Sequence, residues 1–300
     1  MTAQNNLGSS FTFPGTALTV HRMGYGAMRL TGPRIWGPPR DRAQAIAVLR
    51  EAIAAGVNHI DTSDYYGPYV TNQIIREALH PYPDGLVIVT KVGARRGPDA
   101  SWLPARSRQD LIDAVDDNLR RLGLDALDVV NLRVGGLEAP ADTPIEPEFS
   151  VLAELRQQGK IRELGLSNVT PAQLKEAQMI APVVCVQNFY NVARRADDRF
   201  IDDLAQHGIA YVPFFPLGGF TPLQSSELDS AAASIEATPM QLALAWLLHR
   251  SPNILLIPGT SGLIHLRENL ASVDFKLTSE MLNTLDSIAA AAGDAKVAHE

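Results

Sequence analysis

The chain has 300 residues, 46% hydrophobic and 20% charged, a composition typical of a globular protein with a large apolar core. Its net charge is −7 and no basic stripe is present, which argues against a nucleic-acid partner. A single cysteine, the absence of any run of ~18 apolar residues and the absence of a leader pattern predict a cytoplasmic protein without membrane contact.

Eight short apolar runs alternate along the chain with amphipathic segments. They are rich in Val, Ile and Leu without polar alternation, as in strands buried on both faces of a parallel sheet. The runs are residues 22–25, 57–60, 86–90, 127–132, 161–166, 183–186, 209–213 and 254–257. Residues 11–20, ahead of the first run, predict a small hairpin.

The segments between the runs are predicted to be helical. Residues 42–55 and 111–122 place apolar side chains on one side. Thr170 and Thr238 each precede a proline and stand three residues before a glutamine, which predicts two capped helix starts. Glycines stand where helices are expected to stop, at Gly56, Gly123, Gly159 and Gly208.

Eight strand–helix repeats over ~250 residues have the size and rhythm of a (β/α)8 TIM barrel, an α/β fold. An open doubly wound sheet is the alternative. We expect residues 1–300 to form a single barrel domain, with barrel strands from about residue 21 and a C-terminal tail after about residue 288. The hairpin is expected to close the barrel floor.

Several common signatures are missing from the sequence. There is no Walker loop and no His-Glu-x-x-His motif. Gly24-Tyr-Gly-Ala-Met-Arg29 begins like a dinucleotide fingerprint, but Arg29 replaces its last glycine. No two histidines have metal-ligand spacing, so we expect no metal site.

Polar side chains stand at the ends of successive strand runs, which form the functional face of a barrel. Asp61 ends the second run, with Tyr66 in the following loop, and Lys91 and Arg133 end the next two. A phenol has a pKa near ~10, which a nearby ammonium lowers, and a carboxylate can orient that ammonium. Such a phenol can give its proton to a carbonyl oxygen as hydride reaches the carbon.

In these residues the chain resembles the aldo-keto reductase family. The matching stretches, which extend the resemblance from residue 22 to about 288, are Asp61-Thr-Ser-Asp-Tyr-Tyr66-Gly67, Val89-Thr-Lys91, Gly165-Leu-Ser-Asn168, Val186-Gln187-Asn188, Ile257-Pro-Gly-Thr-Ser261 and Arg267-Glu-Asn269. The resemblance implies a carbonyl reductase that binds NADP(H). It also implies that Tyr66 is the proton donor, that Lys91 lowers its pKa and that Asp61 pairs with Lys91.

The resemblance further implies where the cofactor lies. Ser167, Asn168 and Gln187 would hold its carboxamide, and Phe214 would stack on its nicotinamide ring. The full set of expected cofactor residues is Gly26, Met28, Asp61, Ser167, Asn168, Gln187, Phe214, Pro216, Leu217, Gly218, Gly219, Pro258, Gly259, Thr260, His265, Glu268 and Asn269. Of these, Leu217 to Gly219 would lie along the pyrophosphate, and the last four would surround the adenosine and its 2′-phosphate.

Two positions depart from the family pattern. Arg133 stands where the family has a histidine, and arginine cannot shuttle protons because it stays protonated. It can polarise a carbonyl and position the substrate, or it can pair with a loop carboxylate. Gly259 stands where many members have a lysine against the 2′-phosphate. His265 and Arg267 remain as cations there, and an NADP preference is expected.

Residues 29–41, 91–97, 127–134 and 212–224 look closer to the pyridoxal-reducing members of this family. That resemblance implies reduction of pyridoxal to pyridoxine. The expected substrate residues are Trp36, Tyr66, Trp102, Arg133 and Phe215. A general reductase of sugar, steroid or xenobiotic carbonyls, or a nucleotide-binding redox sensor, are the alternatives. The expected partner is a small carbonyl substrate alone, bound by a monomer or weak homo-oligomer.

Two residues beside the motif are not assigned to the chemistry. His59 lies two residues before Asp61 on the same strand, so it faces the same side about one layer deeper. We expect it in the core beneath the site. Tyr65 is expected to shape the loop that carries Tyr66.

Overall fold

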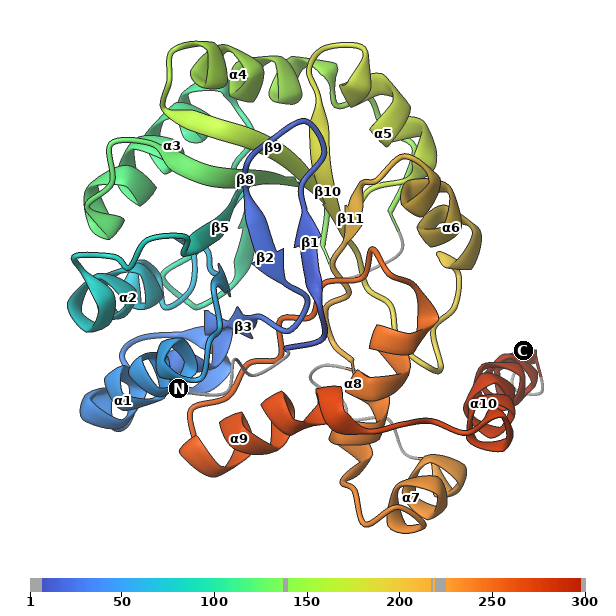
Figure 1. Ribbon diagram of the computed structural model, residues 1–300. Helices are drawn as coiled ribbons and strands as arrows, with labels where there is room; N and C mark the ends of the chain where they lie inside the picture. Colours follow the sequence, from blue (N-terminus) through green and yellow to red (C-terminus); the bar gives the residue numbers. More distant parts are fainter. Residues whose placement is uncertain (1–6, 137–139, 217, 219–224, 298–300) are drawn as a thin grey trace.

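The computed structural model describes residues 7–136, 140–216, 218 and 225–297. Seven parallel strands form a curled sheet in the order β11-β10-β9-β8-β5-β4-β3. Their bounds are β3 Tyr25–Gly26, β4 His59–Asp61, β5 Val87–Val92, β8 Leu127–Arg133, β9 Ile161–Ser167, β10 Val183–Gln187 and β11 Ala210–Tyr211. Figure 1 looks along the axis around which they curl.

The eighth predicted run closes the sheet into a barrel. Ile254 bridges Tyr211 of β11, and Leu256 bridges Met23 ahead of β3, both in parallel. The amide of Leu256 donates to the carbonyl of Arg22 at 2.7 Å. The predicted (β/α)8 barrel is confirmed. Its last run joins by single bridges rather than a long ladder.

Helices surround the sheet on its outer side (Figure 1). They are α1 Arg42–Ala54, α2 Val70–Leu79, α3 Arg108–Leu122, α4 Glu146–Gln157, α5 Pro171–Gln178, α6 Asp198–Gln206, α7 Ser226–Ala233, α8 Pro239–Arg250, α9 Leu263–Ala271 and α10 Ser279–Val297, with short 3-10 helices η1 Ala27–Leu30, η2 Pro33–Ile35 and η3 Ser272–Asp274. None of these described helices is long and apolar enough to cross a membrane.

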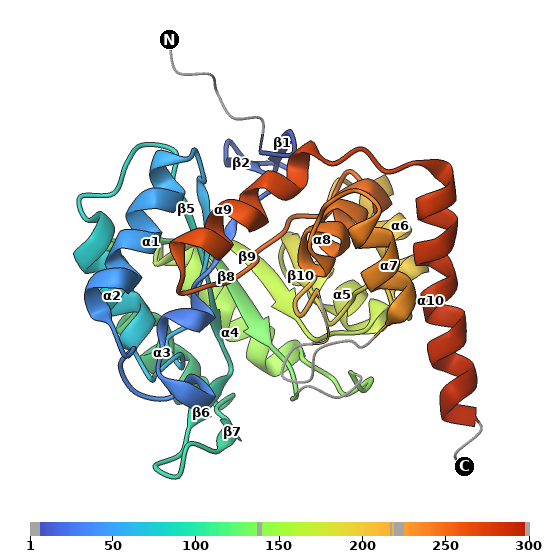
Figure 2. The same cartoon turned by 90° about the horizontal axis from the view of Figure 1, so that it is seen from below.

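The predicted helix ends are confirmed. Thr170 and Thr238 both form capping boxes, with Gln173 and Gln241 respectively. The four glycines expected to stop helices all have positive φ. The segment after residue 288, expected as a tail, instead continues α10 to Val297, and α10 packs along α7 (Figure 2).

The predicted hairpin consists of β1 Ser10–Thr12 and β2 Thr19–His21, which pair antiparallel. Val20 of β2 and Phe13, which follows β1, are almost fully buried against barrel residues that include Val129, Cys185 and Leu255. Burial in this cluster raises the pKa of the Cys185 thiol to about 12, so the thiol stays protonated. Figure 2 shows the hairpin at the opposite end from strands β6 Ala94–Arg96 and β7 Trp102–Pro104. The end near β6 and β7 is therefore the one left for a functional site.

Candidate active site

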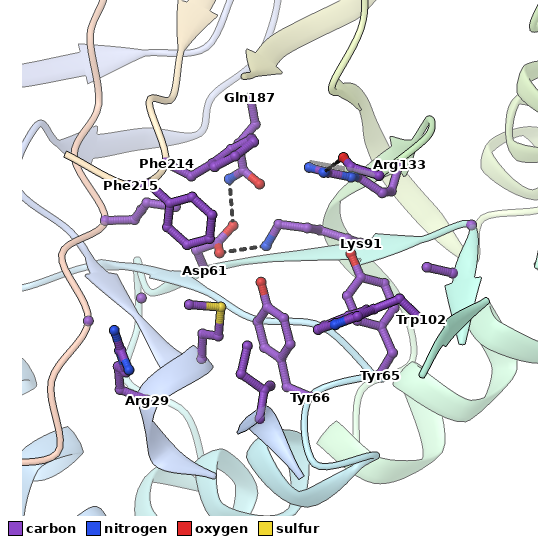
Figure 3. Close-up of a pocket in the computed structure, with 18 of the residues that line it drawn as sticks. Arg29, Asp61, Tyr65, Tyr66, Lys91, Trp102, Arg133, Gln187, Phe214 and Phe215 are labelled. Atoms are coloured by element: carbon purple, nitrogen blue, oxygen red, sulfur yellow. Dashed lines mark hydrogen bonds and ion pairs between the residues drawn. The ribbon is translucent and has the colours of Figure 1, made fainter. Parts of the chain in front are cut away.

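A cavity of about 870 Å³ opens at the C-terminal ends of the parallel strands. All four residues predicted to be catalytic line it: Asp61, Tyr66, Lys91 and Arg133 (Figure 3). Asp61 ends β4 opposite Val89 of β5, and Lys91 lies two residues further along β5, on the same face. The register of the two strands therefore brings the carboxylate and the ammonium together.

Lys91 and Asp61 form a buried ion pair at the centre of the site. The Lys91 Nζ lies 2.6 Å from Oδ1 of Asp61, and both side chains are 5% exposed. The same ammonium donates to the carbonyl of Thr62 at 3.0 Å. Gln187 donates from Nε2 to the other carboxylate oxygen at 2.9 Å (Figure 3). Both oxygens of Asp61 are thus held, which fixes the orientation of Lys91.

The phenol of Tyr66 stands beside this pair, with the Lys91 Nζ 5.3 Å from the centroid of its ring. Burial raises the pKa of Tyr66, the charge of Asp61 raises it further, and Arg133 opposes them. The shift runs against the expectation that Lys91 lowers this pKa. The reason is that Asp61 neutralises the ammonium at close range, so burial prevails and the phenol stays protonated.

Arg133, at the end of β8, is held mainly by backbone groups. Its guanidinium donates to the carbonyls of Gly135, at 3.3 Å, and Gly136, and to the hydroxyl of Ser167 at 3.1 Å. It also lies 5.1 Å from the centre of the Phe214 ring. No ion pair joins Arg133 to a carboxylate of the described part of the chain. Its cation therefore faces the cavity.

Only one of the three residues expected to hold the carboxamide lines the cavity. Gln187 does, whereas Ser167 and Asn168 are almost fully buried outside its lining. Asn168 donates from Nδ2 to the carbonyl of Val134 at 2.9 Å, and Ser167 accepts from Arg133. Arg133, which stands at the position of the family histidine, thus occupies the hydroxyl of Ser167 with a hydrogen bond. The sequence pattern could not reveal this contact.

The aromatic wall of the cavity differs from the expectation in one residue. Trp102 and Phe215 line the cavity as predicted, but Trp36 does not, and Ile35 takes its place. Ile35 has a φ of 57°, a left-handed conformation that redirects the chain, and the Trp36 ring packs on the Arg96 guanidinium 5.4 Å away. The same guanidinium lies 4.0 Å from the ring centre of Trp102 and so holds that wall.

Tyr65 lines the cavity as well, although it was expected only to shape the loop. Its ring is 5% exposed and meets Tyr66 edge to face, with 5.4 Å between centroids. It meets Trp102 in the same way at 5.7 Å. No sequence pattern indicates that two neighbouring loop residues face the same cavity. The second phenol in the cavity is therefore visible only in the packing.

Gly26 and Gly259 line the other side of the cavity, where their backbones lie in close contact. A Cβ at Gly26 would lie 2.4 Å from the carbonyl oxygen of Ile257, and a Cβ at Gly259 would lie 2.6 Å from that of Gly26. A lysine at position 259 would therefore require the backbone to shift. The Arg29 side chain lies beside this point, its Cγ 3.6 Å from the same Cβ position, and its guanidinium is exposed (Figure 3).

The remaining cofactor positions fall into two groups. Met28, Phe214, Pro216 and Pro258 line the cavity. Gly218 has a φ of 87° and is half-buried, and Leu217 and Gly219 lie outside the described residues.

The residues expected around the adenosine, Thr260, His265, Glu268 and Asn269, lie outside the cavity lining. The Thr260 carbonyl accepts from the Tyr25 hydroxyl at 2.6 Å. His265 Nδ1 lies 2.9 Å from Glu268, and Arg267 Nε lies 2.9 Å from Glu51. Both cations expected at the 2′-phosphate are therefore already paired with carboxylates.

His59 lies beneath the site, as expected. Its side chain is 1% exposed, and burial lowers its pKa to about 4. A neutral imidazole at this depth belongs to the core of the barrel and not to the reacting surface.

Comparison with known proteins places this geometry in a family. The profile of the Aldo/keto reductase family matches residues 22–290. The chain is 67% identical over 282 residues to "Pyridoxine 4-dehydrogenase" of Escherichia coli K12, covering 93% of this chain and 99% of that protein. A thermostable aldo-keto reductase solved with epalrestat shares 30% identity at a TM-score of 0.78, covering 93% of this chain and 99% of that one. An aldo/keto reductase of Klebsiella pneumoniae, solved with NADP and acetate, shares 26% identity at 0.75, covering 93% and 94%.

Proposed function

Because the chain belongs to the aldo/keto reductase family, we propose that it is an NADPH-dependent carbonyl reductase whose substrate is pyridoxal and whose product is pyridoxine. The observation that carries this proposal is the neutral Tyr66 phenol beside the buried Lys91–Asp61 pair, inside a cavity with aromatic walls. The 67% identity to the E. coli pyridoxine 4-dehydrogenase supports the choice of substrate.

The cavity suits a nicotinamide dinucleotide, which would supply the hydride to the carbonyl carbon when bound. Phe214 presents a half-buried ring, and Gln187 retains an amide oxygen able to accept from a carboxamide while its Nε2 holds Asp61. Gly26 and Gly259 line the cavity without side chains, which leaves their backbone open to a ligand on the cavity side. Arg29 offers a cation for a cofactor phosphate at the point where Gly259 cannot.

Tyr66 would give its proton to the carbonyl oxygen as that oxygen becomes an alkoxide. A raised pKa does not hinder this step, because an alkoxide is a stronger base than a phenolate. The Lys91–Asp61 pair would hold a fixed dipole beside the phenol and exclude water from it. The Arg133 cation would attract a polar group of the substrate without exchanging protons.

A steady-state assay of pyridoxal with NADPH tests this function. We expect stoichiometric formation of pyridoxine, identified by chromatography, at a kcat/KM at least ~10-fold above that for aliphatic and sugar aldehydes, since only the aromatic ring fills the walls. Equal rates across the aldehyde panel would favour a general carbonyl reductase. Tight NADPH binding without turnover of any carbonyl would favour a sensor.

The setting of the enzyme is part of the same proposal. We place it in the cytoplasm as a monomer or weak homo-oligomer acting on a small carbonyl substrate. The single, buried cysteine suits a reducing compartment. Sedimentation at several protein concentrations tests the oligomeric state, and a tight dimer or tetramer would contradict it.

A further inference from the structure

Two phenols and one guanidinium share the substrate side of the cavity. Tyr65 lies in the loop that leaves β4, and Arg133 ends β8, two strands away in the sheet. Figure 3 shows the hydroxyls of Tyr65 and Tyr66 pointing toward the same level of the cavity, with Arg133 on the far side of Lys91. Of the two phenols, only Tyr66 has a role in the chemistry proposed above.

The electrostatic contacts single out Tyr65 as the phenol most strongly coupled to Arg133. Burial lowers the pKa of Arg133, and among the groups that oppose this, Tyr65 contributes more than Tyr66. In turn, burial and Tyr66 raise the pKa of Tyr65, whereas Lys91, Arg133 and the Ser63 hydroxyl lower it. Lys91 and Arg133 are thus the two cations that act on the Tyr65 hydroxyl, and both favour an anionic or strongly polarised oxygen beside it.

Aromatic rings flank the space around the Tyr65 hydroxyl. The Trp102 ring stands edge to face with Tyr65 at 5.7 Å, and the Arg133 guanidinium lies near the face of Phe214. A planar aromatic ring fits between such rings with its polar substituents directed at the two phenols. When the carbonyl oxygen of an aromatic aldehyde lies at the Tyr66 hydroxyl, the substituent on the neighbouring ring carbon would point toward Tyr65.

We propose that Tyr65 and Arg133 form a subsite for an acidic hydroxyl group ortho to the reacting aldehyde, so that the enzyme selects ortho-hydroxy aromatic aldehydes. The Tyr65 hydroxyl donates a hydrogen bond to the substrate oxygen, and Arg133 balances its negative charge. This inference rests on the proposed function, because pyridoxal carries such a hydroxyl. Tyr65 acts as a specificity-determining residue, and proton transfer to the carbonyl stays with Tyr66.

The test compares 2-hydroxybenzaldehyde with benzaldehyde and 2-methoxybenzaldehyde, using NADPH. In the wild type we expect kcat/KM for the hydroxy compound to exceed that of the other two by ~10-fold or more, the worth of one charge-assisted hydrogen bond. Tyr65→Phe keeps the ring that packs on Tyr66 and Trp102, and its preference ratio should fall toward one. The change should appear mainly in KM. Tyr69→Phe, whose ring packs on Arg121, is the matched control and should keep the wild-type ratio.

Arg133→Met provides a second, pH-based readout. In the wild type, the preference should grow as the substrate hydroxyl ionises with rising pH, and in Arg133→Met this growth should vanish. Affinity for 2-hydroxybenzyl alcohol relative to benzyl alcohol, measured by fluorescence, should follow the same order without turnover. An unchanged preference in Tyr65→Phe overturns the subsite while leaving the reductase intact. Failure of the wild type to reduce pyridoxal as well as the three aldehydes overturns the proposed function instead.

Discussion

The Lys91 ammonium and the Asp61 carboxylate lie 2.6 Å apart at the ends of adjacent strands, where solvent hardly reaches them. Gln187, four strands from Asp61 in the sheet, holds the second carboxylate oxygen across the barrel. The side chains at three strand ends thus interact with one another through Asp61. The position of the Tyr66 phenol depends on these interactions, because the loop that carries it leaves β4 directly after Asp61.

Removing one partner of this pair should destabilise the protein strongly. Lys91→Met leaves the Asp61 carboxylate buried without a cation, which we expect to cost about 3–5 kcal/mol of unfolding free energy. The double variant Asp61→Asn with Lys91→Met removes both charges and should lose less than the single variant. Urea unfolding of the wild type, the two single variants Lys91→Met and Asp61→Asn, and the double variant measures this. A double variant as unstable as the sum of both single variants would show that the two charges are not coupled.

Replacing the proposed acid should abolish reduction without loosening cofactor binding. Tyr66→Phe removes the only proton that this phenol can give, so we expect kcat/KM to fall at least ~100-fold with benzaldehyde. The dissociation constant for NADPH should stay within about twofold, since no charge changes. Tyr69→Phe serves as the control here too. A Tyr66→Phe enzyme of near wild-type activity would exclude the assignment.

The raised pKa of Tyr66 predicts opposite pH profiles for the two reaction directions. Burial keeps the phenol protonated well into the alkaline range, so reduction, which uses the protonated form, should be flat from about pH 6 to pH 9. Alcohol oxidation needs the phenolate as proton acceptor and should rise up to ~10-fold per pH unit over that range. Benzaldehyde and benzyl alcohol suit the measurement because neither titrates there. A reduction rate that falls between about pH 7 and pH 8 would contradict a raised pKa.

Arg29 should contribute to cofactor affinity. Arg29→Met removes the exposed cation beside Gly259, and we expect NADPH to bind ~10-fold or more weakly, as for a lost charge-assisted hydrogen bond. Arg29→Lys should recover part of the loss. Fluorescence titration with NADPH and NADH locates the contact, because a pyrophosphate contact weakens both and a 2′-phosphate contact weakens only NADPH. Arg50→Met, on the outer side of α1, is the charge-matched control. Unchanged affinity for both nucleotides would remove Arg29 from the site.

The sequence determined the barrel and the four residues at its centre. Runs buried on both faces require a covered parallel sheet, and parallel strands deliver their C-terminal residues to one end, so Asp61, Lys91 and Arg133 had to meet there. The helix starts at Thr170 and Thr238 were equally readable, because a capping box involves only residues three apart.

Only the tertiary structure decided which neighbours of these residues face the cavity. Tyr65 enters it, Trp36 turns away after the left-handed Ile35, and Ser167 is engaged by Arg133. Arg29 reaches the place where Gly259 has no room for a side chain. Each outcome depends on packing between segments that are distant in sequence, or on loop dihedrals that no periodic pattern encodes. The alternation of side chains along a strand determines which residues point to the same face of the sheet. The neighbours of a loop side chain are instead determined by contacts across the barrel.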